Sequence, residues 1–182
     1  MEHFFETIEG WFNCEPLYKE MVQGAESGAV FVEVGAWKGR SAAFMCVEIL
    51  NSGKDIFFDV VDHFKGGPEH VDFGEVVNGT LAAEFAKNMK PVEGVFRLLD
   101  TPSTEAANLH PDATVDFCYI DGSHDYDDVK ADILAWLPKI KPGALLAGDD
   151  YNHFDGVKMA VDELLPGADT SQNVWRYICP ST

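Results

Sequence analysis

A short stretch from Val30 to Met45 places the strictest limits on how this chain can fold. An apolar, β-branched run ends in Glu33, Val34 and Gly35, and a second glycine, Gly39, precedes a run of small and apolar residues. This order is typical of a buried strand, a tight turn and the first turn of a helix. In an α/β sheet, small ligands bind at such a junction, because the amides of the helix N-terminus point toward it.

The rest of the chain repeats this alternation of strand and helix. Apolar periodicity predicts strands at residues 30–34, 56–62, 95–99, 115–121, 144–148 and 173–179. It predicts helices over residues 3–28 with a break at Pro16, after Gly39, over 81–89, from about 103, over 125–137 and over 157–165. The segment 63–79 is rich in Gly, Pro and charge and is expected to form a mobile loop or a lid.

This pattern predicts an α/β fold, a Rossmann-like, doubly wound and mostly parallel sheet of about six or seven strands with helices on both faces. The length of 182 residues fits a single domain over 1–182. We expect an N-terminal helical extension at 1–28 and the sheet core at 30–179.

Composition excludes several classes of protein. No apolar run approaches the length of a membrane span, and the N-terminus lacks the pattern of a secretory signal, so we expect a cytoplasmic protein without a membrane partner. The net charge of −18 would repel a phosphate backbone, so nucleic acid is not expected as a partner. A structural zinc site or a disulfide framework is not expected either, since no C-x-x-C pair occurs among Cys14, Cys46, Cys118 and Cys179.

Acidic residues stand at the carboxyl end of nearly every predicted strand. The parallel strands of such a sheet all end at one edge, and ligands bind there at the switch in strand order. The side chains expected to converge on one crevice are Glu33, Asp62, Asp100, Asp121, Asp149 and Asp150.

The glycines of the first turn indicate the kind of cofactor. Gly35 and Gly39 form G-x-x-x-G and lack the third glycine of the G-x-G-x-x-G motif, which disfavours a dinucleotide. Asp62 follows the second strand, where a carboxylate can accept hydrogen bonds from both ribose hydroxyls. A ribose site without a pyrophosphate site favours an adenosine-type cofactor.

Three blocks of sequence resemble one known family. The block 31–41 (FVEVGAWKGRS) is similar to the first motif of class I S-adenosylmethionine-dependent methyltransferases. The blocks 121–126 (DGSHDY) and 137–151 (LPKIKPGALLAGDDY) resemble methyltransferase family 24, which is catechol-O-methyltransferase-like. The resemblance runs from about 30 to 175 and leaves out 1–28 and 63–79.

The resemblance implies roles for individual residues. The methionine end of S-adenosylmethionine would lie at the first turn, with Asp62 at the ribose and Asp100 near the adenine. The residues implied in cofactor binding are Glu33, Gly35, Ala36, Trp37, Gly39, Ser41, Asp62, Asp100 and Asp121.

In related metal-dependent O-methyltransferases, one acid after the fourth strand and an acid–amide pair after the fifth hold Mg²⁺, and a Lys acts as the base. Here Asp121, Asp149 and Asp150 match the metal positions, with Asp150 in place of the amide, and His124 stands where the Lys would be. Asp121 and His124 are therefore the expected catalytic residues, with His153 as an alternative base. Three carboxylates suit Mg²⁺ or another divalent cation.

These observations predict methyl transfer from S-adenosylmethionine to a hydroxyl of a small-molecule acceptor, a sugar or a phenol. Two other functions stay open: a metal-dependent phosphoesterase, and a non-catalytic module that binds S-adenosylmethionine. We expect 1–28 and 63–79 to build the acceptor pocket, with Trp11, Phe12 and Trp37 as wall residues, and we consider assembly as a homodimer.

Overall fold

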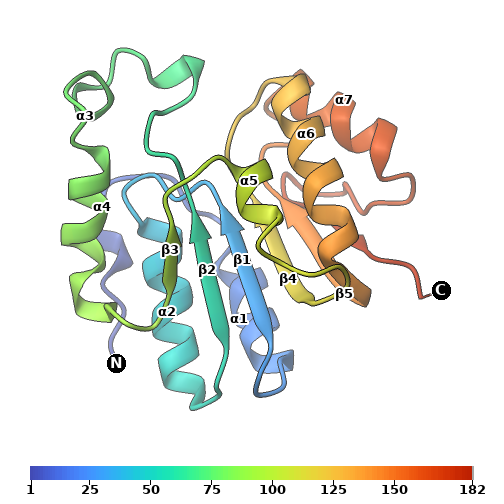
Figure 1. The fold of residues 1–182 in the computed structure, drawn as a ribbon, viewed down its shortest axis with the longest axis horizontal. Helices are drawn as coiled ribbons and strands as arrows, with labels where there is room; N and C mark the ends of the chain where they lie inside the picture. The colour runs from blue at the N-terminus through green and yellow to red at the C-terminus, as the bar shows by residue number, and fades with distance from the viewer. Residues whose placement is uncertain (182) are drawn as a thin grey trace.

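The computed structural model describes residues 1–181. Its centre is a six-stranded sheet in the order β3-β2-β1-β4-β5-β6, in which only β6 runs antiparallel to its neighbour (Figure 1). The strands are β1 (Val30–Val34), β2 (Phe57–Val61), β3 (Arg97–Leu99), β4 (Val115–Ile120), β5 (Ile140–Gly148) and β6 (Trp175–Ile178). The predicted Rossmann-like, mostly parallel sheet is confirmed.

Helices cover both faces of this sheet (Figure 1). One face packs against α1 (Glu15–Gly24), α2 (Arg40–Ser52) and α4 (Leu81–Met89). The other packs against α5 (Ser103–Ala107), α6 (Tyr126–Trp136) and α7 (Asp155–Leu164). Short helical turns occur at η1 (Phe5–Thr7), η2 (Pro68–His70), α3 (Gly74–Val77), η3 (Lys90–Val92) and η4 (Leu137–Lys139).

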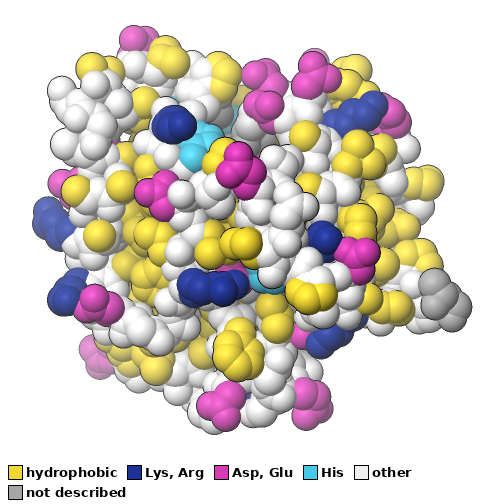
Figure 2. Space-filling model, in the orientation of Figure 1, with side chains coloured by type: hydrophobic (Ala, Val, Ile, Leu, Met, Phe, Trp, Pro, Cys, Tyr) yellow, Lys and Arg dark blue, Asp and Glu magenta, His cyan; other side chains and the backbone are white. Residues whose placement is uncertain are grey.

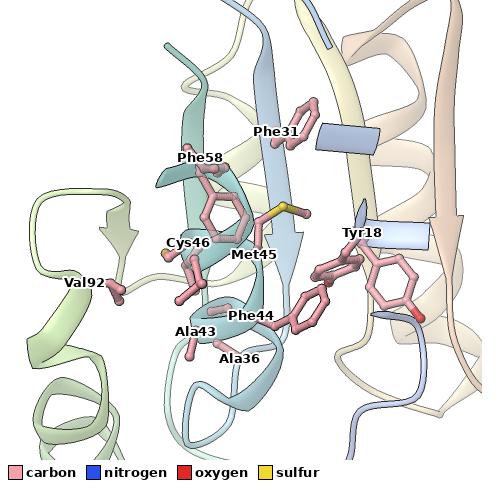
Figure 3. Packing of buried hydrophobic residues seen from close by; sticks show 14 of the residues in the cluster. Tyr18, Phe31, Ala36, Ala43, Phe44, Met45, Cys46, Phe58 and Val92 are labelled. Carbon is pink, nitrogen blue, oxygen red and sulfur yellow. The ribbon is translucent and has the colours of Figure 1, made fainter. Parts of the chain in front are cut away.

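Side chains of the central strands point alternately to the two faces of the sheet, so the core consists of two layers. In β1, Phe31 belongs to the layer that also holds Met45 of α2 and Phe58 of β2 (Figure 3). Its neighbour Val32 points to the opposite layer, which also holds Trp136 of α6. Successive side chains of a strand face opposite sides, so a central strand covered on both faces is apolar almost throughout.

The N-terminal region differs from the predicted helix over 3–28. Only η1 and α1 are helical there, because Gly10 adopts a φ of +145°, which a regular helix cannot contain. Pro16 lies in the first turn of α1, where its missing N–H costs nothing, so it begins this helix rather than breaking one. The aromatic residues of the segment still pack on the sheet layer through Phe44, which contacts Phe5 and Phe12.

Two further boundaries differ from the predictions. Strand β5 begins at Ile140, before the predicted start at residue 144, and includes Pro142 and Gly143. The segment 63–79 contains η2 and α3 instead of irregular chain throughout. Across residues 1–181, no helix is long and apolar enough to span a membrane.

The order of the strands fixes where a ligand can bind. The chain moves outward from β1 to β3 and then returns to place β4 on the other side of β1. The carboxyl ends of β1 and β4 therefore form the switch point of the sheet, where open α/β folds bind ligands. Figure 2 shows the acidic side chains scattered over the visible face with Lys and Arg among them.

Candidate active site

A cleft of about 400 Å³ lies at this switch point. Its floor is formed by the residues that follow β1, β2 and β4, and the segment after β2 forms one wall. The opposite wall comes from the segment after β3 and from α6. The lining residues include Gly35, Trp37, Asp62, His63, Gly66, Gly67, Pro68, His70, Thr101, Pro102, Ser103, Thr104, Asp121, Gly122, Ser123, Asp128, Ala131 and Asp132.

Glycine is required at the first turn for two reasons. Gly35 has a φ of +87°, and a Cβ there would lie 2.0 Å from the carbonyl oxygen of Asp121. Gly39, before α2, has a φ of +91°, and its Cβ would lie 2.9 Å from Sδ of Met89. At Gly35 the backbone can therefore lie against the end of β4, beside the cleft, only when no side chain is present, whereas Gly39 lies outside the cleft lining and allows close packing on Met89 of α4.

The Asp62 carboxylate lines the cleft and also holds the turn. Its Oδ2 accepts hydrogen bonds from the amides of Ala36 and Trp37, each at 2.9 Å, and its Oδ1 accepts one from Phe64 at 2.7 Å. A carboxylate has about four acceptor positions, so one position on Oδ1 stays open for a ligand hydroxyl. Asp62 is thus a turn residue in this structure, and the open position could accept a hydrogen bond from one ribose hydroxyl but not from both.

Glu33 and Ser41 lie beneath the turn and not in the cleft. Oε1 of Glu33 accepts a hydrogen bond from Ser41 at 2.7 Å, and Oε2 accepts one from the Tyr18 hydroxyl at 2.9 Å. Burial raises the pKa of Glu33 to about 7, although these two hydrogen bonds lower it. The three side chains join β1 to α1 and α2, so Glu33 and Ser41 contact a cofactor at most through the backbone that they support.

Asp100, expected near the adenine, is exposed and is not among the cleft residues. The four residues that follow it, Thr101 to Thr104, line the cleft in its place. The structure therefore brings the segment after Asp100, and not the Asp100 side chain, into the cleft.

A second group of side chains lies beside the cleft at the ends of β4 and β5. Ligand atoms of Asp121, His124 and Asp150 all lie within 4.8 Å of one another, and Nε2 of His124 is 2.9 Å from Oδ2 of Asp150. Burial raises the pKa of Asp121 well above its usual value, and the charges of Asp149 and Asp150 raise it further. Such a group of carboxylates favours binding of a cation or a proton.

The composition of this group differs from the predicted metal set. Oδ1 of Asp149 accepts hydrogen bonds from the amide of Asp150 at 2.8 Å and from Nδ2 of Asn173 at 2.5 Å. His124 thus joins Asp121 and Asp150 in the compact group, while Asp149 lies beside it. Asn173 was not predicted as a site residue, because no sequence pattern around it indicates that the segment before β6 returns to this site.

Both histidines considered as bases contact the same carboxylate. Nδ1 of His153 lies 3.1 Å from Oδ1 of Asp150, whose Oδ2 faces His124. Burial would raise the pKa of Asp150, but hydrogen bonds from the two histidines bring it below its usual value. The ring of His124 also stacks on Phe154 with centroids 3.9 Å apart, which fixes its plane.

Segments 1–28 and 63–79 meet at the rim of the cleft. Trp37 and His70 of the cleft lining pack with Trp11 and Phe73, with ring centroids 4.6 to 6.4 Å apart. The buried amine of Lys38 lies 2.7 Å from carboxylate oxygens of both Glu9 and Glu75. One lysine of the first turn therefore ties together the N-terminal segment and the segment after β2.

The strand order, the glycine turn and the acids at the strand ends together define a Rossmann-like fold of the class I methyltransferase type. The solved O-methyltransferase NovP has this fold: 19% identity, a TM-score of 0.72, and coverage of 92% of this chain and 79% of that chain. SMU.1697c from Streptococcus mutans, solved in complex with S-adenosylhomocysteine, shows 10% identity and a TM-score of 0.60, with 90% and 86% coverage.

The chain belongs to methyltransferase family 24, whose methyltransferase domain matches residues 32–151. An uncharacterised protein of Sinorhizobium fredii, y4gI, is 30% identical over 149 residues, or 81% of this chain. The chain spans 16% of the length of that curated relative.

Proposed function

We propose that this chain transfers the methyl group of S-adenosylmethionine to a hydroxyl of a small-molecule acceptor. The observation that carries the proposal is the charge of the cleft. Its described lining residues include Asp62, Asp121, Asp128 and Asp132, and none of them is Lys or Arg. Such a cleft favours a cationic sulfonium and disfavours the phosphates of a dinucleotide.

The cofactor would lie along the floor of the cleft. The turn from Gly35 to Gly39 faces the N-terminus of α2, which suits the methionine carboxylate. Asp62 offers its open acceptor position to the ribose. The segment from Thr101 to Thr104 and the adjoining face of α6 would enclose the adenine. NovP and the S-adenosylhomocysteine complex of SMU.1697c support this assignment as proteins of the same fold.

The acceptor would be positioned beside Asp121, His124 and Asp150. S-adenosylmethionine supplies a methyl group bound to a positively charged sulfur, so the protein must orient the acceptor hydroxyl and accept its proton. His124, oriented by Asp150 and by stacking on Phe154, is the proposed base, and His153 is the alternative on the same carboxylate. A sugar or phenol hydroxyl is the proposed acceptor.

The same group is a candidate site for a divalent cation. Two carboxylates and an imidazole suit Mn²⁺ and other transition metals as well as Mg²⁺, which prefers oxygen ligands. A bound cation would lower the pKa of an acceptor hydroxyl. If Nε2 of His124 binds a cation, it cannot accept a proton, so this role would leave His153 as the base.

A metal-dependent phosphoesterase is less well supported, because that reaction has no use for the glycine turn at Gly35 and the carboxylate of Asp62, which line the cleft. Calorimetry with S-adenosylmethionine and, separately, an assay with a generic phosphoester distinguish the functions. Cofactor binding together with transfer of the methyl group to a hydroxylated acceptor supports the proposal. Cofactor binding without turnover on any acceptor in a broad screen would favour a binding module.

A further inference from the structure

We propose that Asp132 of α6 recognises the adenine of the cofactor, by accepting a hydrogen bond from its exocyclic 6-amino group. This inference rests on the proposed function, because it takes an adenosyl cofactor as the ligand of the cleft. No role for Asp132 follows from the sequence patterns or from the methyl-transfer chemistry described above.

The position of Asp132 on α6 sets it apart from the rest of that helix. Val129, Ile133 and Trp136 are buried against the sheet, as the amphipathic pattern requires. Asp132 is also buried, with 9% of its surface exposed, yet it lines the cleft together with Asp128 and Ala131. These three positions are spaced by three and four residues, so they share one face of the helix.

Ser103 is a neighbour of the Asp132 carboxylate and can act toward it only as a hydrogen-bond donor. The indole Nε1–H of Trp136 donates to Oγ of Ser103 at 2.8 Å, and an indole nitrogen can only donate. The Ser103 hydroxyl therefore keeps its own proton for another acceptor, and its interaction with the Asp132 carboxylate lowers the pKa of that group. At most one of about four acceptor positions of the carboxylate is used in this way.

The remaining acceptor positions call for a donor from the ligand. A buried carboxylate is costly unless hydrogen bonds compensate it, and no Lys or Arg lies among the described residues of the cleft. A Cβ on Gly122 would lie 3.8 Å from Oδ2 of Asp132, which places this oxygen beside the end of β4. The segment Thr101 to Thr104 lines the same end of the cleft, where the adenine is proposed to lie.

The ionisation of Asp132 agrees with this role. Burial raises its pKa to about 6, and the nearby charge of Asp128 also raises it, whereas the Ser103 hydrogen bond lowers it. Above that pH the group is an acceptor-only carboxylate, which matches the N–H donors of an adenine 6-amino group and opposes the 6-oxo group of hypoxanthine.

The test compares S-adenosylhomocysteine with S-inosylhomocysteine, which carries a 6-oxo group, by calorimetry at pH 8. The wild type should bind the adenosyl ligand at least about tenfold more tightly, since hydrogen bonds to charged groups contribute this much. In Asp132→Asn the preference should fall to about threefold or less, because a carboxamide can pair with either group. Asp127→Asn changes an exposed residue of the same helix and should keep the wild-type preference.

A purely structural role would give a different result. If Asp132 only ties α6 to α5 through Ser103, Asp132→Asn should weaken both ligands equally and leave their ratio unchanged, and the inference falls. Equal binding of the two ligands by the wild type also overturns it, whether or not the variant folds. No binding of S-adenosylhomocysteine to the wild type would reject the cofactor assignment itself, and the inference with it.

Discussion

Gly35 and Asp121 meet across the switch point of the sheet, so closely that a Cβ on Gly35 would lie 2.0 Å from the carbonyl oxygen of Asp121. The amide of Asp121 also donates to the carbonyl oxygen of Val34 at 2.8 Å. The turn proposed to hold the cofactor and the acid proposed to serve the chemistry are thereby fixed in one rigid unit.

Gly35→Ala should consequently disrupt both parts of the site. Gly28→Ala is the matched control, because Gly28 has a similar φ of +93° but open space where the Cβ would lie. The control should lose about 1–2 kcal/mol of unfolding free energy from backbone strain alone. Gly35→Ala should lose more unfolding free energy than the control, and it should no longer bind S-adenosylhomocysteine. Equal destabilisation of the two variants in urea unfolding, with cofactor binding kept, would show that the contact has no such role.

The raised pKa of Glu33 leads us to expect a particular dependence of stability on pH. Its pKa is raised by burial from 4.5 to about 7, so the folded state holds a proton that the unfolded state releases between these values. This difference in pKa adds about 3 kcal/mol to the free energy of unfolding below about pH 4.5, and this contribution is lost as the pH rises through 7. Glu33→Gln should remove this part of the pH dependence of the unfolding free energy.

The exposed Glu26 provides the control for that measurement. Glu26→Gln should leave the pH profile of unfolding as it is in the wild type. The same decline between pH 4.5 and 7 in Glu33→Gln would show that other groups, and not Glu33, cause it.

A divalent cation bound at Asp121, His124 and Asp150 should stabilise the folded state. At a concentration one hundred times its Kd, Mn²⁺ or Mg²⁺ should add about 2.7 kcal/mol, or several degrees in Tm. Asp150→Ala should abolish the shift, whereas Asp125→Ala, at an exposed neighbouring position, should preserve it. A Tm unaffected by either ion in the wild type rejects the metal site.

His124 and His153 can be distinguished once a screen of hydroxylated molecules supplies an acceptor. Replacing a general base lowers turnover by about 10² to 10⁴. His124→Ala should show such a loss with the affinity for S-adenosylmethionine unchanged, and His153→Ala should keep most of the activity. The reverse result would transfer the base role to His153 and agree with His124 as a metal ligand.

The fold could be predicted from the sequence because each central strand contains a short apolar run that ends at a turn or an acid. The N-terminal segment could not, since the helical spacing of its aromatic residues arises from packing around Phe44 while Gly10 interrupts the helix. Helical periodicity and tertiary packing produce the same pattern over so short a segment.

The site could be predicted at the level of segments but not of side-chain directions. Acids at the strand ends do converge, yet Asp150 has a φ of +67°, and His124 joins it in the compact group while Asp149 binds Asn173. Asp132 reads in the sequence as an ordinary polar position of an amphipathic helix. Only the packing of α6 against both the sheet and the cleft shows that this carboxylate is buried.

Calorimetry of S-adenosylmethionine binding to the wild type, Asp62→Ala and Asp100→Ala tests the central claim most directly. The wild type should bind with a one-to-one stoichiometry, and Asp62→Ala should bind at least about tenfold more weakly, because it loses the acceptor at the ribose and the hydrogen bonds that hold the turn. Asp100→Ala, at an exposed residue outside the cleft lining, should match the wild type. No binding by folded wild-type protein would contradict the account.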